Sequence, residues 1–209
     1  MKPISLLKAA AFAAALIPAA ALAYRLYRFF YTQDLNALSA NPGDYITDQT
    51  GTWALALLVI TLTITPLRRL TKWNELVKLR RMLGLFSFFY ATLHMLTWVV
   101  FVNYFDVRAM IADVGEKPYI FVGMATFLIL LALAVTSNRF ALRRLGRRWQ
   151  RLHRLVYVAA IGGVIHFWWQ VKADITLPRR WAVAVALLLL FRVWWAWRRK
   201  SPTARPQPS

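Results

Sequence analysis

The chain is dominated by apolar stretches about as long as a membrane is thick. Six of them, joined by short connections, lie at residues 5–24, 51–67, 84–102, 119–136, 152–171 and 181–197. Each approaches the roughly 20 helical residues that cross a hydrocarbon core of about 30 Å. Lipid offers the backbone no hydrogen-bond partners, so spanning stretches of this kind are helical. The sequence therefore predicts an all-α, polytopic membrane bundle with six transmembrane helices.

The short connections leave no room for a sizeable soluble domain. We therefore expect residues 1–200 to form one transmembrane domain. Residues 201–209 contain three prolines and no apolar run, so we expect a disordered tail there.

Basic residues gather on one side of this predicted bundle. Eighteen lysines and arginines lie before or at the start of the first stretch, after the last, or between stretches two and three or four and five, whereas the opposite loops carry seven. The positive-inside rule then places both termini in the cytoplasm. A net charge of +19 would suggest nucleic acid in a soluble protein. Here the charge is a topology signal, so we expect the lipid bilayer as a partner and no nucleic acid.

The first stretch has two interpretations. Lys2, Lys8, an Ala-rich run and the segment Ala21-Leu22-Ala23 resemble a signal peptide with its cleavage site. Cleavage would leave five spans with the same loops inside. However, the apolar region is long, and aromatic residues at 24–31 continue it as an interface belt. We therefore expect a retained helix.

All three histidines lie inside apolar stretches, and the chain has no cysteine. The missing cysteines exclude disulfides, thiolate-bound iron–sulfur clusters and covalently attached c-type haem. Ionisable groups at membrane depth usually face the protein interior and are functional candidates. Because imidazole is a common ligand of haem iron, His94, His153 and His166 are candidate haem ligands.

Counting residues from the cytoplasmic ends of stretches three and five gives the depth of each histidine. At about 1.5 Å per residue, His94 lies ~18 Å deep, His166 ~21 Å deep and His153 only ~2 Å deep. His94 and His166 are therefore expected to hold one iron between two parallel helices. His153 is either a ligand of a second haem or an interfacial histidine. Gly162 and Gly163, between the two, either bend the helix or allow close packing.

Several short segments recur in the same order in one family. They are Ile64-Thr65-Pro66-Leu67-Arg68, Arg80-Arg81-Met82-Leu83-Gly84, Ala91-Thr92-Leu93-His94, Lys117-Pro118-Tyr119, residues 131–137, residues 148–157 and Ile165-His166. Over about residues 5–200, this ordered set resembles the MsrQ family, formerly YedZ. Its members are haem-binding membrane subunits of bacterial periplasmic methionine sulfoxide reductase systems.

The resemblance implies a ferric-reductase-like transmembrane domain in the bacterial inner membrane that carries b-type haem and allows FMN. It implies a non-catalytic subunit that passes electrons to a periplasmic molybdopterin methionine sulfoxide reductase, which repairs oxidised proteins. His94, His153 and His166 match the family's histidine positions. Wider relatives carry four haem histidines, and this chain has three, so a second haem would need another kind of ligand.

No dinucleotide-binding domain is evident, so the quinone pool or a separate cytosolic flavin reductase is the expected electron donor. The alternatives are a transporter and a non-redox anchor for a peripheral protein. A transporter would be expected to show broken or charged spans, and Arg192 is the one strongly polar residue besides the histidines well inside a span. In a passive anchor, histidines at matched depth would have no role.

Overall fold

The computed structural model describes residues 3–171 and 173–198, and this part of the chain contains helices and no strand. In chain order the elements are α1 (Pro3–Tyr31), η1 (Leu35–Leu38), α2 (Pro42–Thr71), η2 (Asn74–Leu79), α3 (Arg80–Thr97), η3 (Trp98–Val102), α4 (Val107–Glu116), α5 (Pro118–Val135), α6 (Arg139–Leu145), α7 (Arg147–His153), α8 (Leu155–Gln170) and α9 (Thr176–Arg198). The predicted tail at 201–209 lies outside the described residues.

In the part of the chain that the structure describes, five helical segments are long and apolar enough to cross a membrane. They are Ile4–Tyr31, Pro42–Thr71, Asn74–Val102, Pro118–Val135 and Thr176–Arg198. The remaining stretch, 152–171, is not one uninterrupted helix, because α7 ends at His153 and the 16-residue α8 begins at Leu155. At Arg154 the backbone bonds shorten to a three-residue spacing, from Arg154 N to Arg151 O and from Tyr157 N to Arg154 O. This local tightening separates His153 from the helix that carries His166.

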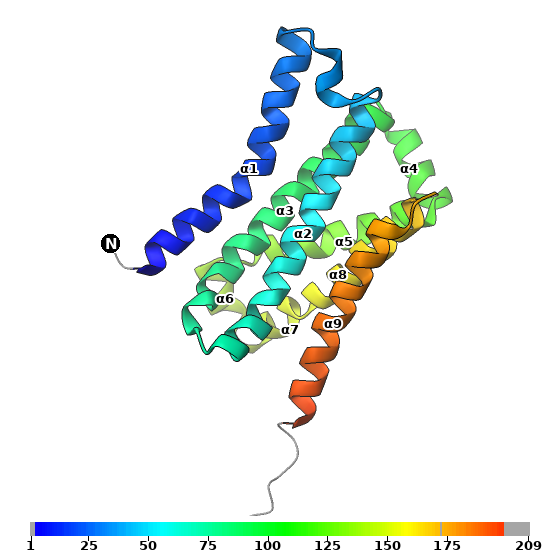
Figure 1. The fold of residues 1–209 in the computed structure, drawn as a ribbon. Helices are drawn as coiled ribbons and strands as arrows, with labels where there is room; N and C mark the ends of the chain where they lie inside the picture. The colour runs from blue at the N-terminus through cyan, green and yellow to red at the C-terminus, as the bar shows by residue number, and fades with distance from the viewer. Residues whose placement is uncertain (1–2, 172, 199–209) are drawn as a thin grey trace, which may run out of the picture.

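The second helix is the centre of the bundle. Figure 1 shows α2 and α3 side by side, with α5 and α8 behind them and α9 along α8. One buried apolar cluster joins α2, α5, α8 and α9 around Leu58, Leu62 and Ala160. A second cluster joins α1, α2, η2 and α3 around Leu57, Leu83 and Tyr90. Because α2 contributes to both clusters, it fixes the positions of the helices on either side of it.

A tyrosine hydroxyl is inserted into the backbone ladder of α1. The Tyr90 hydroxyl donates to Ala15 O at 2.8 Å and accepts from Ala19 N–H at 3.0 Å. These two groups would otherwise bond to each other in a regular helix. An inserted side chain and a proline, here Pro18, are both known causes of helix kinks. The bend in α1 is visible in Figure 1.

A proline also interrupts α2, and an arginine from α9 compensates for it. Pro66 lacks an N–H, so the carbonyl of Leu62 loses its usual intrahelical donor. Arg192 Nη2 donates to this carbonyl at 2.5 Å, and Nη1 donates to Leu188 O at 3.1 Å. The Arg192 guanidinium also lies 5.2 Å from the centre of the Tyr157 ring. The charged residue inside a predicted span therefore satisfies a backbone group in the membrane.

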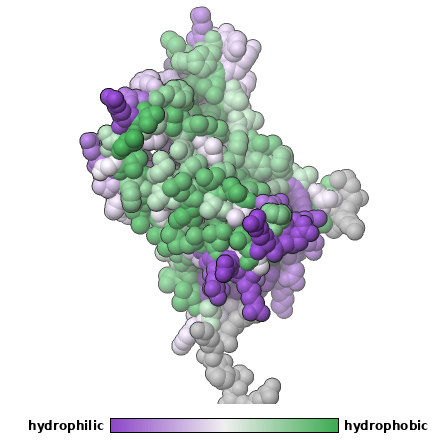
Figure 2. Space-filling view, turned by 180° about the vertical axis from the view of Figure 1, so that it is seen from behind, coloured by the Kyte–Doolittle hydropathy of each residue, from purple (hydrophilic) through white to green (hydrophobic). Residues whose placement is uncertain are grey.

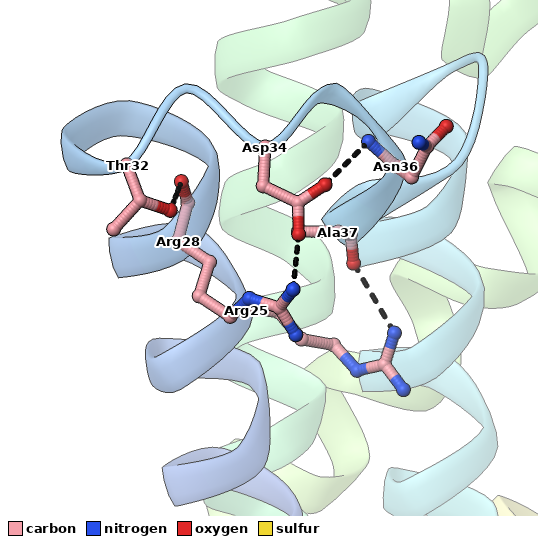
Figure 3. Close-up of polar contacts among 6 residues, drawn as sticks. All are labelled: Arg25, Arg28, Thr32, Asp34, Asn36 and Ala37. Atoms are coloured by element: carbon pink, nitrogen blue, oxygen red, sulfur yellow. Dashed lines mark hydrogen bonds and ion pairs between the residues drawn. The ribbon is translucent and has the colours of Figure 1, made fainter.

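The end of α1 opposite the N-terminus is closed by a small polar network (Figure 3). Arg28 forms an ion pair with Asp34, which caps η1 by accepting from Asn36 N. Arg25 donates to Ala37 O at 3.1 Å. These two arginines are among the seven basic residues on the side with fewer basic residues, and both have partners within the protein.

The surface separates into an apolar middle and polar ends. In Figure 2, hydrophobic side chains cover the middle of the face, and hydrophilic side chains gather most densely toward the lower end. The arginines of α6 and α7 are exposed. A belt of apolar surface between polar ends is what a protein that spans a bilayer requires. The chain is a membrane protein.

Candidate functional site

His94 and His166 face each other across a cavity inside the helix bundle. The cavity has a volume of about 280 Å³ and lies among α2, α3, α5 and α8. Its lining is mainly apolar, with Leu55, Phe127 and Phe167 among the side chains. The centres of the two imidazole rings are 5.9 Å apart, and their planes are 83° apart. The two histidines that the depth count paired are therefore brought together.

The imidazole of His94 is held by the backbone of α2. Its Nδ1 lies 3.0 Å from the carbonyl oxygen of Thr47. A carbonyl can only accept, so Nδ1 carries the proton and Nε2 keeps a free lone pair. One turn further along α2, Gly51 leaves room for the ring, because a Cβ there would lie 2.9 Å from both Cε1 and Nδ1 of His94.

The imidazole of His166 is held in the same way by α5. Its Nδ1 lies 2.7 Å from the carbonyl oxygen of Tyr119, so Nδ1 again donates and Nε2 is again free. Gly123 follows four residues after Tyr119, and a Cβ there would lie 2.6 Å from Nδ1 of His166. Both histidines therefore present the nitrogen that binds metals.

The histidine, the residue whose carbonyl accepts from it and the nearby glycine form one unit, and the two such units share one sequence spacing. In each unit the carbonyl residue precedes its histidine by 47 positions and is followed four residues later by the glycine. No internal repeat is evident from the sequence itself, and the histidines alone do not reveal this relation. Thr47, Gly51, Tyr119 and Gly123 are the site residues that the sequence analysis missed. The recurrence of a glycine at the same distance before each deep histidine is the signal that could have found them.

The geometry fits a metal that brings other ligands of its own. Metal–imidazole bonds of ~2 Å place the centres of two opposed rings about 6 Å apart, close to the observed separation. Within residues 3–171 and 173–198, no group of three or more His, Asp or Glu side chains could hold a metal ion. A bare ion would therefore lack ligands here, whereas haem iron arrives with the nitrogens of its porphyrin.

The third histidine lies apart from this pair. His153 Nε2 is 3.1 Å from the Thr136 hydroxyl, and its ring stacks on Trp149 with ring centres 3.9 Å apart. It does not line the cavity. Its Nε2 is already in a hydrogen bond, and the structure does not bring His153 together with His94 or His166.

The glycine pair between His153 and His166 has a packing role. Gly162 faces Thr126 of α5 so closely that a Cβ would overlap the Thr126 hydroxyl. Gly163 lines the cavity and faces Leu55. The pair therefore lets α8 approach α5 and α2, and the helical hydrogen-bond pattern is interrupted instead at Arg154.

Polar residues lie at the end of the cavity where α2 and α5 begin and α8 ends. They include Asp44, Asp48, Lys117 and Gln170. Trp98, also in the lining, donates from Nε1 to Asp113 of α4 at 3.3 Å. Lys117 forms an ion pair with Asp113, and its hydrogen bond lowers the pKa of that carboxyl below the ordinary value. The ionised carboxylate thus ties α4 to the rim of the cavity.

Comparisons with known proteins identify what this chain is similar to. The family model described as "Ferric reductase like transmembrane component" matches residues 50–164. A protein-methionine-sulfoxide reductase heme-binding subunit MsrQ from Herminiimonas arsenicoxydans is 49% identical over 201 residues, covering 95% of this chain and 89% of that protein. The subunits of the same name from Bordetella pertussis and Xanthomonas axonopodis pv. citri are 46% and 44% identical, covering 95% and 92% of this chain and 94% and 88% of those proteins.

Proposed function

This chain belongs to the MsrQ family of ferric-reductase-like membrane proteins, and from that premise we propose that it is a non-catalytic electron-transfer subunit. It binds haem and serves a protein-methionine-sulfoxide reductase, supporting the repair of oxidised proteins. Residues 1–200 form its single transmembrane domain. It would lie in the bacterial inner membrane with six spans and both termini in the cytoplasm. The sixth span would be α8, and α1 would be retained rather than cleaved.

His94 and His166 are the axial ligands of one b-type haem in this proposal. The observation that carries it is the separation of 5.9 Å between two imidazoles that each donate from Nδ1 to a backbone carbonyl. Bound there, haem iron supplies one-electron transfer without covalent attachment to the protein.

The chain's own residues prepare the site for that role. The carbonyls of Thr47 and Tyr119 fix the tautomer and direction of the two rings. Leu55, Phe127 and Phe167 keep water away from them. His153 is the weakest of the three candidate ligands, and a second haem would bind near it, toward the cytoplasmic surface. FMN is a further cofactor that the family allows.

The same proposal names the electron acceptor and the electron donor. Electrons would leave toward a periplasmic molybdopterin-containing methionine sulfoxide reductase. They would enter from the quinone pool or from a cytosolic flavin reductase.

The test is the visible spectrum of the purified protein and of four variants. We expect a low-spin b-type spectrum that His94→Ala and His166→Ala each abolish, because such a site needs both ligands. The double variant should lose no more haem than either single variant, since the two groups act as a unit. His153→Ala is the control and should leave this haem's spectrum nearly intact.

The contrary result is equally clear. If His153→Ala and His94→Ala remove one common haem while His166→Ala retains it, the pairing is wrong. If the wild-type protein shows no haem spectrum after reconstitution, the electron-transfer function itself fails, and a transporter or a non-redox anchor takes its place.

A further inference from the structure

Each ligand histidine of the proposed haem is placed by two features of a neighbouring helix. The bond from Nδ1 to a backbone carbonyl fixes which nitrogen faces the metal, but a single bond leaves the ring free to turn about that axis. The glycine gives the ring space for the orientation seen here, because a Cβ would stand 2.9 Å from the His94 ring at Gly51 and 2.6 Å from the His166 ring at Gly123. Such distances are shorter than Cβ atoms tolerate, so any side chain there forces the ring to move.

The two features together permit the angle seen between the rings. The imidazole planes of His94 and His166 are 83° apart, which is nearly perpendicular. The units that hold them come from different helix pairs, α2 with α3 and α5 with α8, and have the same sequence spacing. The angle is therefore a property of how the two pairs pack against each other.

We propose that Gly51 and Gly123 are positioning residues that keep the two axial imidazoles of the haem nearly perpendicular. This rests on the proposed function, since it takes His94 and His166 as ligands of one iron. Neighbours that orient a ligand tune the metal, and the relative angle of two axial imidazoles controls the splitting of the iron d orbitals. Perpendicular planes give ferric low-spin iron a strongly anisotropic EPR signal, whereas parallel planes give a rhombic one.

The remaining glycines supply a matched control. Gly84 lies in α3, the helix of His94, and a Cβ there would meet only Thr61 Cγ2 at an ordinary 3.8 Å. Alanine has a higher intrinsic helix propensity than glycine at any of these helical positions. A change seen at Gly51 or Gly123 but not at Gly84 is therefore not an effect of helix propensity.

The experiment compares the full-length haem-loaded protein with Gly51→Ala, Gly123→Ala and Gly84→Ala. We expect a strongly anisotropic low-spin EPR signal in the wild type and in Gly84→Ala. In Gly51→Ala and Gly123→Ala the optical spectrum should stay low-spin, while the EPR signal moves toward the rhombic form and the midpoint potential shifts. Circular dichroism and Tm in detergent should match the wild type in all three variants.

Each other outcome also decides the matter. A variant that loses haem but keeps wild-type helicity and Tm supports the proposal, because the fold survives while the ligand is displaced. Unchanged EPR signals and potentials in Gly51→Ala and Gly123→Ala overturn it and leave the histidine assignment intact. Joint loss of haem and helicity also overturns it, since the glycines then serve helix packing. A wild type without a low-spin haem counts against the proposed function instead.

Discussion

Tyr90 shows how one hydroxyl can attach a whole helix in a membrane. Few residues of α1 are buried, with Ala15 among them, and the Tyr90 hydroxyl bonds to the α1 backbone at both Ala15 and Ala19. Tyr90 itself is only 1% exposed. If α1 were removed, this hydroxyl would face lipid without a partner, which favours α1 as a permanent span.

We therefore expect Tyr90→Phe to lower the free energy of unfolding in detergent by about 1 kcal/mol, the usual size of such a bond in a membrane protein. Denaturation followed by circular dichroism would measure it. Tyr27→Phe, whose side chain is 55% exposed, is the control and should change little. The haem spectrum should be unaffected in both variants. A loss of haem in Tyr90→Phe would show that α1 acts on the site rather than only on stability.

From the sequence, we could predict where His94 and His166 lie along their helices, but not which residues of other helices contact them. The depths of His94 and His166 followed from the fixed rise of a helix, and the structure places their rings together. The partners of those rings, such as Gly51 and the Thr47 carbonyl, depend on which helices are neighbours. That information lies in the packing of α2 against α3 and of α5 against α8, which a single sequence does not state.

At the scale of elements, the contact between α9 and the proline of α2 offers a sharp test. Arg192 donates to the carbonyl that Pro66 leaves without a donor. Arg192→Leu should therefore destabilise the protein by roughly 1–3 kcal/mol, the penalty for an unsatisfied buried group. In the Pro66→Ala background the helix regains its own N–H, and the same substitution should cost less.

A double-mutant cycle measures this coupling through free energies of unfolding in detergent. Arg81→Leu, at an exposed position of α3, is the matched control and should cost the same in both backgrounds. If Arg192→Leu costs the same in the wild-type and Pro66→Ala backgrounds, the arginine has a role other than satisfying this carbonyl.

Element boundaries show where local sequence signals were sufficient and where they were not. The start of α2 at Pro42 follows from the Asn41 cap and from proline in the first turn, although the apolar stretch begins only at residue 51. The tightening at Arg154 has no such signal, since neither glycine nor proline is present there. For this reason the fifth stretch was expected to be one helix and is divided into α7 and α8.

At the scale of the whole molecule, the charge asymmetry makes a prediction about orientation. Reporter fusions after Lys78 and Arg144 should read cytoplasmic, and a fusion near Asp113 should read periplasmic. The physical reason is that basic loops are retained on the cytoplasmic side, while α4 lies at the opposite end with its Asp113 bonded to Trp98. The reverse pattern would contradict the proposed direction of electron flow, toward the periplasm.

The way in which the two imidazoles are held also bears on the speed of electron transfer. Each Nδ1–H is bonded to a main-chain carbonyl near the start of a long helix, and each ring lies beside a glycine of that helix. As ligands of the proposed haem, rings held in this way would move little when an electron arrives or departs. The reorganisation energy of that centre would then be small, and electrons would pass rapidly in either redox direction.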